Sequence, residues 1–428
     1  MERLTATTFG GCGYLAAQNL SLRRLRLNLP TRVRIILRSP ALGGFLAVFV
    51  GHGVGRFAYP ALVPALVEHH WISSSYVGYL GAANLVGYLL GSLCGVRGKP
   101  TATHIGPSML AVAISYLACS FPLGFWWLFA WRFVAGVGGG LVMTAAIPIL
   151  QARTETAKRA GVVAFTFAGI GVGIVLTGAA MPRLLSHSIG FASAAMAMLS
   201  LVLTMVSWQA WQMAGPVAIK TEGMPITVRW TAQRVPISLL AISYATAAIA
   251  FVPYTIFWVD YIARGLHAGI RQAVMCWMLF GISAAFGPLL CAPITTRMGT
   301  ARALRWALLA NGAAVALPLV STNLGLLAIS SIGAGSMGLG IPFLTATRAR
   351  EIAPPELHQR LWAGMTIVYA IAYAVAGWVF SSIFAVKQSY QFLFLWSGIA
   401  VLLGGITQYF GLPRVRHPSQ EEVSSRAA

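Results

Sequence analysis

Two arginines lie inside long apolar stretches of the sequence and are the residues best suited to chemistry. Arg56 ends the run GHGVGR, and Arg132 interrupts the run FWWLFAWRF. A guanidinium among apolar residues is unfavourable unless it faces water, a partner or a bound solute, and its planar fork matches a carboxylate. His52 precedes Arg56 by four residues, which places both side chains on one face of a helix. We predict that Arg56 attracts an anionic group and that His52 is its hydrogen-bond partner or a proton carrier.

Each of these residues also has a purely structural interpretation. Arg56 could bond carbonyl groups of neighbouring helices or reach a membrane interface, and a lone histidine is often satisfied within a core. Arg132 could belong to a conformational gate instead of a binding site. Tyr59 and Tyr254, in the corresponding segments FAYP and FVPY, complete the predicted binding residues as aromatic contacts.

Acidic residues are absent from the apolar stretches, which contain no Asp, Glu or Lys. A site that moves protons often uses a buried carboxylate. Two buried positive charges without buried negative ones favour an anionic ligand over a cation. Glu68 and Asp260 lie just beyond two of the stretches, where they could form a gate or pair with the arginines. Solvated charges at helix ends are the alternative interpretation.

These residues must be positioned by helices that cross a lipid bilayer. Of the 428 residues, 57% are hydrophobic and 9% are charged, whereas soluble domains carry about 25% charged residues. A membrane-spanning helix needs about 20 mostly apolar residues. Twelve stretches come close to this length: 41–64, 76–96, 102–122, 125–150, 161–181, 189–211, 236–258, 272–294, 306–322, 324–346, 362–384 and 390–412. We predict an all-α membrane protein with twelve transmembrane helices, of which the ninth is short.

The basic residues between the stretches predict the orientation. If the N-terminus lies inside, the cytoplasmic segments hold 24 of the 30 Lys and Arg residues and the outer loops hold four. Lys and Arg are enriched in cytoplasmic loops. Both termini are therefore expected in the cytoplasm and the chain in the cytoplasmic (inner) membrane. The net charge of +21 then indicates a basic face against anionic lipid, and no nucleic-acid partner is expected.

The remaining segments divide the chain. Residues 1–39 form a basic tail that we expect to be disordered, with a targeting segment, a surface helix or translation from upstream of the natural start as alternatives. The longest inner connection, 212–235, separates 40–211 from 236–412, and each of these parts holds six stretches. Residues 413–428 form a second cytoplasmic tail.

The five cysteines include no C-x-x-C pair, and no metal, cofactor or enzymatic site is expected.

The two six-helix parts resemble each other in three places. Gly81 and Gly87 share their spacing with Gly281 and Gly287, in the second stretch of each part. The fourth stretches end in IPIL and IPFL, and the first stretches carry FAYP and FVPY. Three matches in the same order indicate the duplication of a six-helix unit, which is common in transporters built from repeats.

A loop motif carries a family resemblance. Residues Gly91–Lys99 read GSLCGVRGK, and APITTRMG is the counterpart in the second part. Both resemble the major facilitator superfamily pattern G-x-L-a-D-R-x-G-R-K, with Gly95 and Thr296 in place of the aspartate. The resemblance implies a gating or coupling role for this loop, and hence for Arg97 and Arg297.

Two further patterns extend the resemblance over residues 40–412. Arg132 with Gly136, Gly138 and Gly140 is similar to the fourth-helix pattern of the superfamily. The runs GHGVGRFAYPALVP and GYLGAANLVGYLLGSL look like the YbfB/YjiJ-type branch of that superfamily.

The resemblance implies two six-helix bundles, related by pseudo-two-fold symmetry, around a cavity that opens alternately to each side. It implies that helices 1, 4, 7 and 10 line this cavity, so that Arg56 and Arg132 could face one space. It also implies that Arg132 acts in packing or proton movement.

The expected function is a secondary active transporter of a small organic solute, anionic if the arginines bind it. A drug or metabolite efflux pump, or a sensor that kept the fold without transport, is the alternative. We expect a monomer whose partners are the small-molecule substrate and the lipid bilayer.

Overall fold

The structure of the protein is a computed structural model that describes residues 39–97, 102–155, 158–212, 230–353 and 358–410. Apart from Ser39, the tails expected at 1–39 and 413–428 lie outside these residues, as does most of the connection expected at 212–235. The described residues form helices joined by short turns and contain no strand.

The helices follow the order of the predicted stretches. The first part contains α3 (Pro40–Val48), α4 (Tyr59–Glu68), α5 (Val77–Arg97), α6 (Ile105–Ala118), α7 (Phe125–Arg153), α8 (Arg159–Leu185) and α9 (Ile189–Gln212). The second contains α10 (Trp230–Val252), α11 (Trp258–Asp260), α12 (Gly269–Met298), α13 (Thr300–Val320), α14 (Leu324–Ile352), α15 (His358–Lys387) and α16 (Tyr390–Phe410). Short π-helical segments are η1 (Phe49–Val54), η5 (Pro253–Phe257) and η6 (Tyr261–Gly265), and 3-10 turns are η2 (Ser74–Tyr76) and η3 (Ala102–His104).

Eleven helical segments among the described residues are long and apolar enough to cross a membrane. One further apolar helix, Ala102–Ala118, is shorter. The prediction of a short ninth helix was wrong, because α13 has 21 residues. Arg302 and Arg305 lie in its first two turns and interrupt the apolar pattern without ending the helix. The short helix is the third one, within the predicted stretch 102–122.

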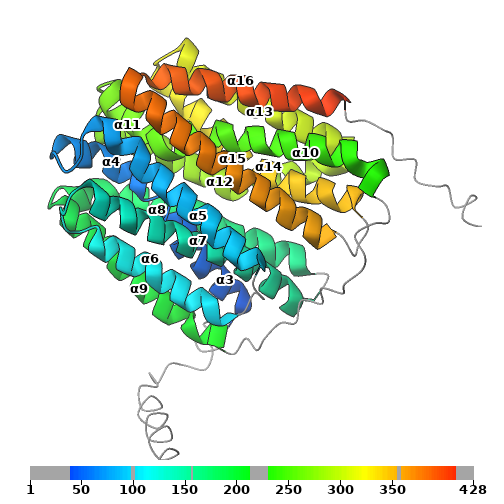
Figure 1. The fold of residues 1–428 in the computed structure, drawn as a ribbon, viewed down its shortest axis with the longest axis horizontal. Helices are drawn as coiled ribbons and strands as arrows, with labels where there is room; N and C mark the ends of the chain where they lie inside the picture. The colour runs from blue at the N-terminus through cyan, green and yellow to red at the C-terminus, as the bar shows by residue number, and fades with distance from the viewer. Residues whose placement is uncertain (1–38, 98–101, 156–157, 213–229, 354–357, 411–428) are drawn as a thin grey trace, which may run out of the picture.

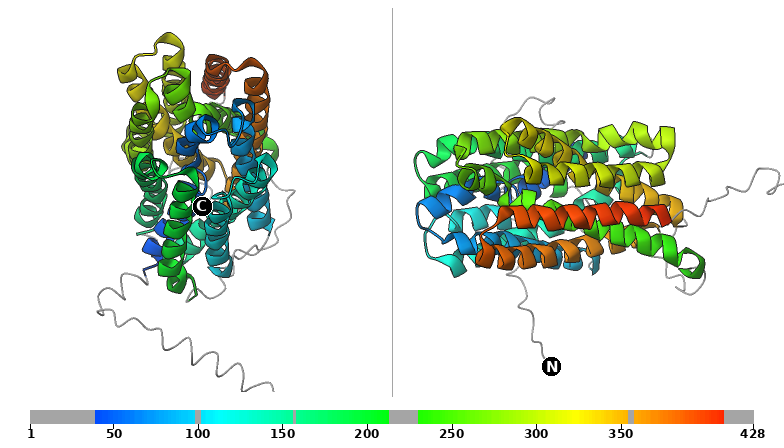
Figure 2. Two further views of the ribbon diagram at one scale, coloured as in Figure 1. Left: turned by 90° about the vertical axis from the view of Figure 1, so that its left-hand side faces the viewer. Right: turned by 90° about the horizontal axis from the view of Figure 1, so that it is seen from above.

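The helices pack in two sets (Figure 1). In the first set α5 and α6 pack on α7, and α3 packs on α8 and α9. In the second set α12 and α13 pack on α14, and α10 and α13 pack on α16. The two sets meet along α5 with α15, along α8 with α12, and where α4 lies beside α11. The helices run side by side along the long axis of the molecule (Figure 2).

Two ends of this arrangement matter for the site. The turns after α4, η6 and α15 lie at one end, at the left of Figure 1, and we call it the Asp260 end. Helices α5 and α12 run to the opposite end, which we call the Arg297 end. The sequence predicts that the Asp260 end faces outward.

The first and seventh membrane-spanning segments are interrupted near their middle. In the first, the N–H groups of Gly55 and Phe57 donate to carbonyls five residues back, on Val50 and His52, at 2.9 and 3.0 Å. In the seventh, η5 begins with Pro253, which has no N–H to donate. Such π-helical turns are rare in proteins overall, and those that occur often lie at functional sites.

Close packing accompanies the first interruption. A Cβ added to Gly53 would lie 2.7 Å from Cα of Gly173 in α8, so no side chain fits between the two backbones. The GHGVG run therefore lets the interrupted segment lie directly against α8.

Candidate functional site

Arg56 lies in the turn that joins η1 to α4, with 8% of its surface exposed. Its Cζ is 4.1 Å from the ring centroid of Tyr373 and 5.3 Å from those of Phe57 and Tyr88. We call these four residues the Arg56 cage. Among the described residues, Nε and Nη2 of Arg56 have no hydrogen-bond partner. A purely structural role for Arg56 would require hydrogen bonds from these atoms to carbonyl groups of neighbouring helices, and the described residues provide none.

His52 lies in η1 and is 3% exposed. Its ring meets the ring of Tyr88 edge-on at 5.6 Å, so Tyr88 contacts both His52 and Arg56. Neither ring nitrogen of His52 has a hydrogen-bond partner in the described part of the chain. Buried polar atoms are nearly always paired in native proteins. Two adjacent side chains with unpaired atoms thus indicate a place where a polar ligand can bind.

Arg132 has a different environment. Its Nη1 donates to the carbonyl of Gly55 at 3.0 Å and to the hydroxyl of Tyr116 at 3.2 Å. Asn84 donates to the same Gly55 carbonyl at 3.2 Å, and Tyr116 donates to the carbonyl of Val54 at 2.8 Å. These carbonyls belong to the interrupted helix, so Arg132 braces the interruption through its backbone. The two arginines, expected in one space, are surrounded by different residues.

A small cavity of about 20 Å³ adjoins Arg132. It is lined by Tyr59, Tyr116, Ser193 and Cys119, among others. A space of this size holds about one water molecule. The Cζ of Arg132 also lies 4.5 Å from the ring centroid of Tyr59. In this conformation the cavity beside Arg132 is smaller than an organic solute, and the bonds of Arg132 are those of a residue that packs against the interrupted helix.

The two tyrosines predicted to contact a solute lie outside the cage. The hydroxyl of Tyr59 donates to the carbonyl of Val77 at 2.8 Å. The hydroxyl of Tyr254 lies 2.6 Å from Oγ of Ser330 and donates to the carbonyl of Ala314 at 3.2 Å. Both hydroxyls are thus occupied by the protein itself.

Tyr88 and Tyr373 were not predicted as site residues. From the sequence alone, a tyrosine such as Tyr88 in an apolar stretch is more often a contact between helices than a ligand, and Tyr373 has no partner that the sequence could reveal. The hydroxyl of Tyr373 is 2.5 Å from Oγ1 of Thr255 in η5. Phe251 packs against Phe57 and Tyr373, with centroids 6.4 and 6.1 Å apart. The cage therefore joins the interruptions of the first and seventh segments.

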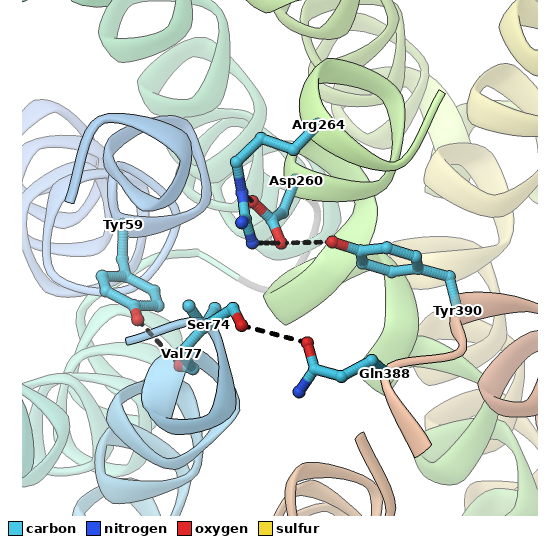
Figure 3. Close-up of polar contacts among 7 residues, drawn as sticks. All are labelled: Tyr59, Ser74, Val77, Asp260, Arg264, Gln388 and Tyr390. Atoms are coloured by element: carbon cyan, nitrogen blue, oxygen red, sulfur yellow. Dashed lines mark hydrogen bonds and ion pairs between the residues drawn. The ribbon is translucent and has the colours of Figure 1, made fainter. Parts of the chain in front are cut away.

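Asp260 contradicts the expectation of a solvated charge at a helix end. It is fully buried and lies within the candidate membrane span Arg234–Gly265, so the expectation that the spans hold no acid is also wrong. Nε and Nη2 of Arg264 donate to its two oxygens at 2.5 and 2.6 Å, and the hydroxyl of Tyr390 donates at 2.6 Å (Figure 3). Its partner is thus Arg264, and neither Arg56 nor Arg132. The sequence missed this because the helix continues beyond the apolar stretch.

Side chains from both sets meet at the Asp260 end. Ser74 donates to Oε1 of Gln388 at 3.0 Å (Figure 3), and Tyr79 donates to Ser382 at 3.1 Å. Glu68 is exposed and within electrostatic range of Arg264 across the two sets. The two hydrogen bonds join the first and second sets at this end.

The candidates at the other end are less informative. Arg97 is the last residue of α5, and its side chain lies outside the description. Arg297 is exposed near the end of α12, and no ion pair is found for it among the described residues. Glu351 binds Arg348 at 2.7 Å and Thr300 at 2.5 Å, so it ties together helices of one set only.

Comparisons with known proteins extend over most of the chain. The family profile described as "Uncharacterised MFS-type transporter YbfB" matches residues 48–408. The chain is 23% identical over 390 residues to the tetracycline resistance protein, class C, of Escherichia coli, covering 88% of this chain and 95% of that protein. It is 31% identical over 140 residues to the 4-hydroxybenzoate transporter PcaK of Acinetobacter baylyi, covering 31% of this chain and 30% of that protein.

Proposed function

Since the chain belongs to the YbfB-type family of major facilitator transporters, we propose that it is a secondary active transporter that moves a small organic anion across the cytoplasmic membrane. Arg56 is the residue that binds the anion, and His52 supplies a second polar contact. The solute is exposed alternately to the two sides of the membrane. Binding and transport then both depend on the Arg56 cage.

The architecture proposed for this function has twelve spans in two six-helix bundles. The eleven long apolar segments and the shorter Ala102–Ala118 supply the spans. The packing of α3–α9 and of α10–α16 into two sets supports the division at 212–235. The excess of Lys and Arg in alternate connections supports cytoplasmic termini.

One observation carries the proposal: the unpaired edge of Arg56. Nε and Nη2 form one side of the guanidinium fork, and both lack partners among the described residues. Arg264 uses this same pair of atoms to hold both oxygens of Asp260. A carboxylate on Arg56 would form the same two parallel bonds, which are among the strongest hydrogen bonds in proteins.

The position of the cage supports alternating access. Arg56 and Phe57 come from the first set, and Tyr373 comes from the second. At the Asp260 end the sets are joined by Ser74 with Gln388 and by Tyr79 with Ser382. Separation of these contacts would open the cage toward that end, as rocking of two repeats against each other requires.

An efflux pump is the second candidate, because one relative that aligns along most of the chain is a tetracycline resistance protein. The two functions differ in the charge of the solute. A pump for neutral or cationic drugs would gain nothing from the unpaired Arg56 edge, whereas a carrier of carboxylates depends on it.

Flux through proteoliposomes tests the proposal. The purified protein is reconstituted, and uptake of labelled acetate, lactate, benzoate and gluconate is measured with and without an imposed proton gradient. We expect uptake of at least one carboxylate and at least a tenfold loss in Arg56→Gln. Arg271→Gln, which removes an exposed guanidinium, is the control and should transport normally.

Three outcomes would contradict the proposal. Binding of a carboxylate without flux would identify a sensor that kept the fold. Export of a neutral or cationic drug with no carboxylate flux would identify an efflux pump. Full carboxylate flux in Arg56→Gln would remove Arg56 from the site.

A further inference from the structure

A continuous row of aromatic side chains leads away from the Arg56 cage. The ring of Tyr373 meets that of Tyr369 at 5.5 Å, and Tyr369 meets Tyr244 of α10 at 4.7 Å. Tyr244 meets Trp362 at 6.1 Å. We call these four residues the aromatic row. Trp362 lies in the second turn of α15, so the row runs from the cage toward the Arg297 end.

The spacing in α15 places the row on one face. Trp362, Tyr369 and Tyr373 are separated by seven and four residues, which is two turns and one turn of a helix. Tyr373 touches Arg56 of the first set, so this face of α15 points toward the junction between the sets. Tyr369 and Trp362 are partly exposed, whereas Tyr373 is buried. Tyr244 is buried as well, so the row is accessible at Tyr369 and Trp362 only in part.

Two hydroxyls of the row lack protein partners. Within the described ranges, no hydrogen bond joins the hydroxyl of Tyr244 or Tyr369 to another residue, while that of Tyr373 is held by Thr255. Neither hydroxyl is among the buried polar atoms without a partner, so both are accessible to a small molecule. The row thus offers aromatic surface together with a few polar positions for a ligand.

The buried charges next to the cage favour a ligand that carries a single negative group. Among the described residues, Arg56 is the buried cation that belongs to the cage, whereas Arg132 lies outside it, against the rings of Tyr59 and Tyr116. Arg264 is engaged by Asp260. A second carboxylate buried beside Arg56 would lack a cation of its own, which is strongly unfavourable.

We propose that the substrate is an aromatic monocarboxylate. Its carboxylate binds Nε and Nη2 of Arg56, and its ring packs among the rings of the cage and of the aromatic row. A hydroxyl on that ring would pair with Tyr369 or Tyr244. This inference rests on the proposed function and narrows its substrate class.

Other carboxylates fit these observations less well. An aliphatic acid would lack the offset and edge-to-face contacts that aromatic rings make with each other. A sugar acid would bring several hydroxyls into a space with few polar partners, and each unpaired hydroxyl would weaken binding. A ring with a single carboxylate satisfies both the charge and the surface.

Binding to the purified full-length protein in detergent tests the inference with matched probes. Benzoate and cyclohexanecarboxylate have similar size and the same charge, but only benzoate has an aromatic ring. Calorimetry is expected to give at least tenfold tighter binding of benzoate. Terephthalate, with two carboxylates, and benzamide, with none, are each expected to bind at least tenfold more weakly than benzoate.

Variants of the row separate the ring from the hydroxyl. Tyr369→Leu should reduce the preference for benzoate over cyclohexanecarboxylate at least threefold. Tyr369→Phe should keep that preference and lose any gain of 4-hydroxybenzoate over benzoate. Phe286→Leu removes an exposed ring elsewhere on the second set and should change neither ratio.

The possible failures are distinguishable. Equal binding of benzoate and cyclohexanecarboxylate would overturn the aromatic substrate class and leave an organic-anion carrier intact. Tighter binding of terephthalate than of benzoate would contradict the proposal that the substrate carries a single carboxylate. Absence of binding for every carboxylate would overturn this inference and the proposed function together.

Discussion

The guanidinium of Arg56, from the first membrane-spanning segment, lies over the ring of Tyr373, from α15, with Cζ 4.1 Å from the ring centroid. The hydroxyl of the same tyrosine meets Thr255 in the seventh segment at 2.5 Å. A single side chain of α15 therefore contacts the interruptions of both segments. A ligand that displaces or orients Tyr373 would act on both sets of helices at once.

Replacing Arg56 by lysine tests the shape of the cation apart from its charge. Arg56→Lys keeps the positive charge but cannot form two parallel bonds or stack flat on Tyr373. We expect benzoate to bind at least tenfold more weakly, and the loss of the flat stacking on the rings should lower the unfolding free energy by about 0.5–2 kcal/mol. Calorimetry and thermal unfolding measure the two quantities, and Arg271→Lys is the exposed control. Normal affinity in Arg56→Lys would mean that only charge matters.

Arg132 is expected to behave in the opposite way. Arg132→Gln removes the bonds to the Gly55 carbonyl and to Tyr116 at the interrupted helix. Loss of such buried partners is expected to destabilise the protein by about 1–3 kcal/mol. Thermal unfolding should show a lower midpoint, while the affinity for benzoate changes less than threefold. Arg183→Gln, an exposed change, should leave the midpoint unaltered. A large loss of affinity without loss of stability would assign Arg132 to the site.

The buried pair of Asp260 and Arg264 gives a third prediction. Asp260→Asn leaves the guanidinium, with 20% of its side chain exposed, without its counter-charge. We expect a loss of stability on the order of 2–3 kcal/mol. The double variant Asp260→Asn with Arg264→Gln should recover part of this loss. Glu68→Gln changes an exposed carboxylate and should have an effect within about 0.5 kcal/mol. An additive double variant would show that the two residues are not coupled.

A reversible crosslink at the Asp260 end tests the need for opening there. Ser74 and Gln388 are joined by a 3.0 Å hydrogen bond between the sets. In a background without the five native cysteines, Ser74→Cys with Gln388→Cys should accept a short thiol crosslinker. We expect transport to stop while binding of benzoate remains, and reduction of a cleavable linker should restore transport. The two single variants are the controls, and undiminished flux in the crosslinked protein would show that this end does not open.

The contact of Gly53 with Gly173 gives a prediction about packing. A methyl group on Gly53 would lie 2.7 Å from a backbone atom of α8. Gly53→Ala should therefore destabilise the protein by about 1–3 kcal/mol. Gly161→Ala is the matched control, because nothing lies within 4 Å of its added Cβ, and it should stabilise α8 by about 0.5–1 kcal/mol. Equal midpoints for both variants would show that the two helices can move apart.

The length of the apolar stretches was sufficient to predict the order and approximate positions of the helices. The predicted stretches and the described helices agree in order, and the exception at α13 arises because Arg302 and Arg305 interrupt the hydropathy pattern but do not break a helix. Helix ends were harder to predict. Asp260 follows the apolar stretch 236–258, yet Arg264 and Tyr390 satisfy its carboxylate inside the fold.

The partners of the predicted site residues required the three-dimensional structure. The sequence singled out Arg56 and His52 because charged and polar groups are rare in apolar helices. It could not pair Arg56 with Tyr373, because 317 positions of chain separate the two residues. It also could not predict the role of Arg132, since the Gly55 carbonyl becomes available only where the first segment leaves the α-helical pattern. Sequence periodicity assumes a regular α-helix. A π-helical turn changes which residues share a face of the helix, so the periodicity no longer predicts their neighbours.

The uncancelled charge of Arg56 has an electrical consequence. An empty cage carries one positive charge inside the membrane, and a bound monocarboxylate would neutralise it. Moving one elementary charge across a membrane potential of 100 mV changes its energy by about 2.3 kcal/mol. The unloaded protein would then carry one more positive charge than the loaded protein, so that the voltage across the membrane would act more strongly on the return step than on the passage of the solute.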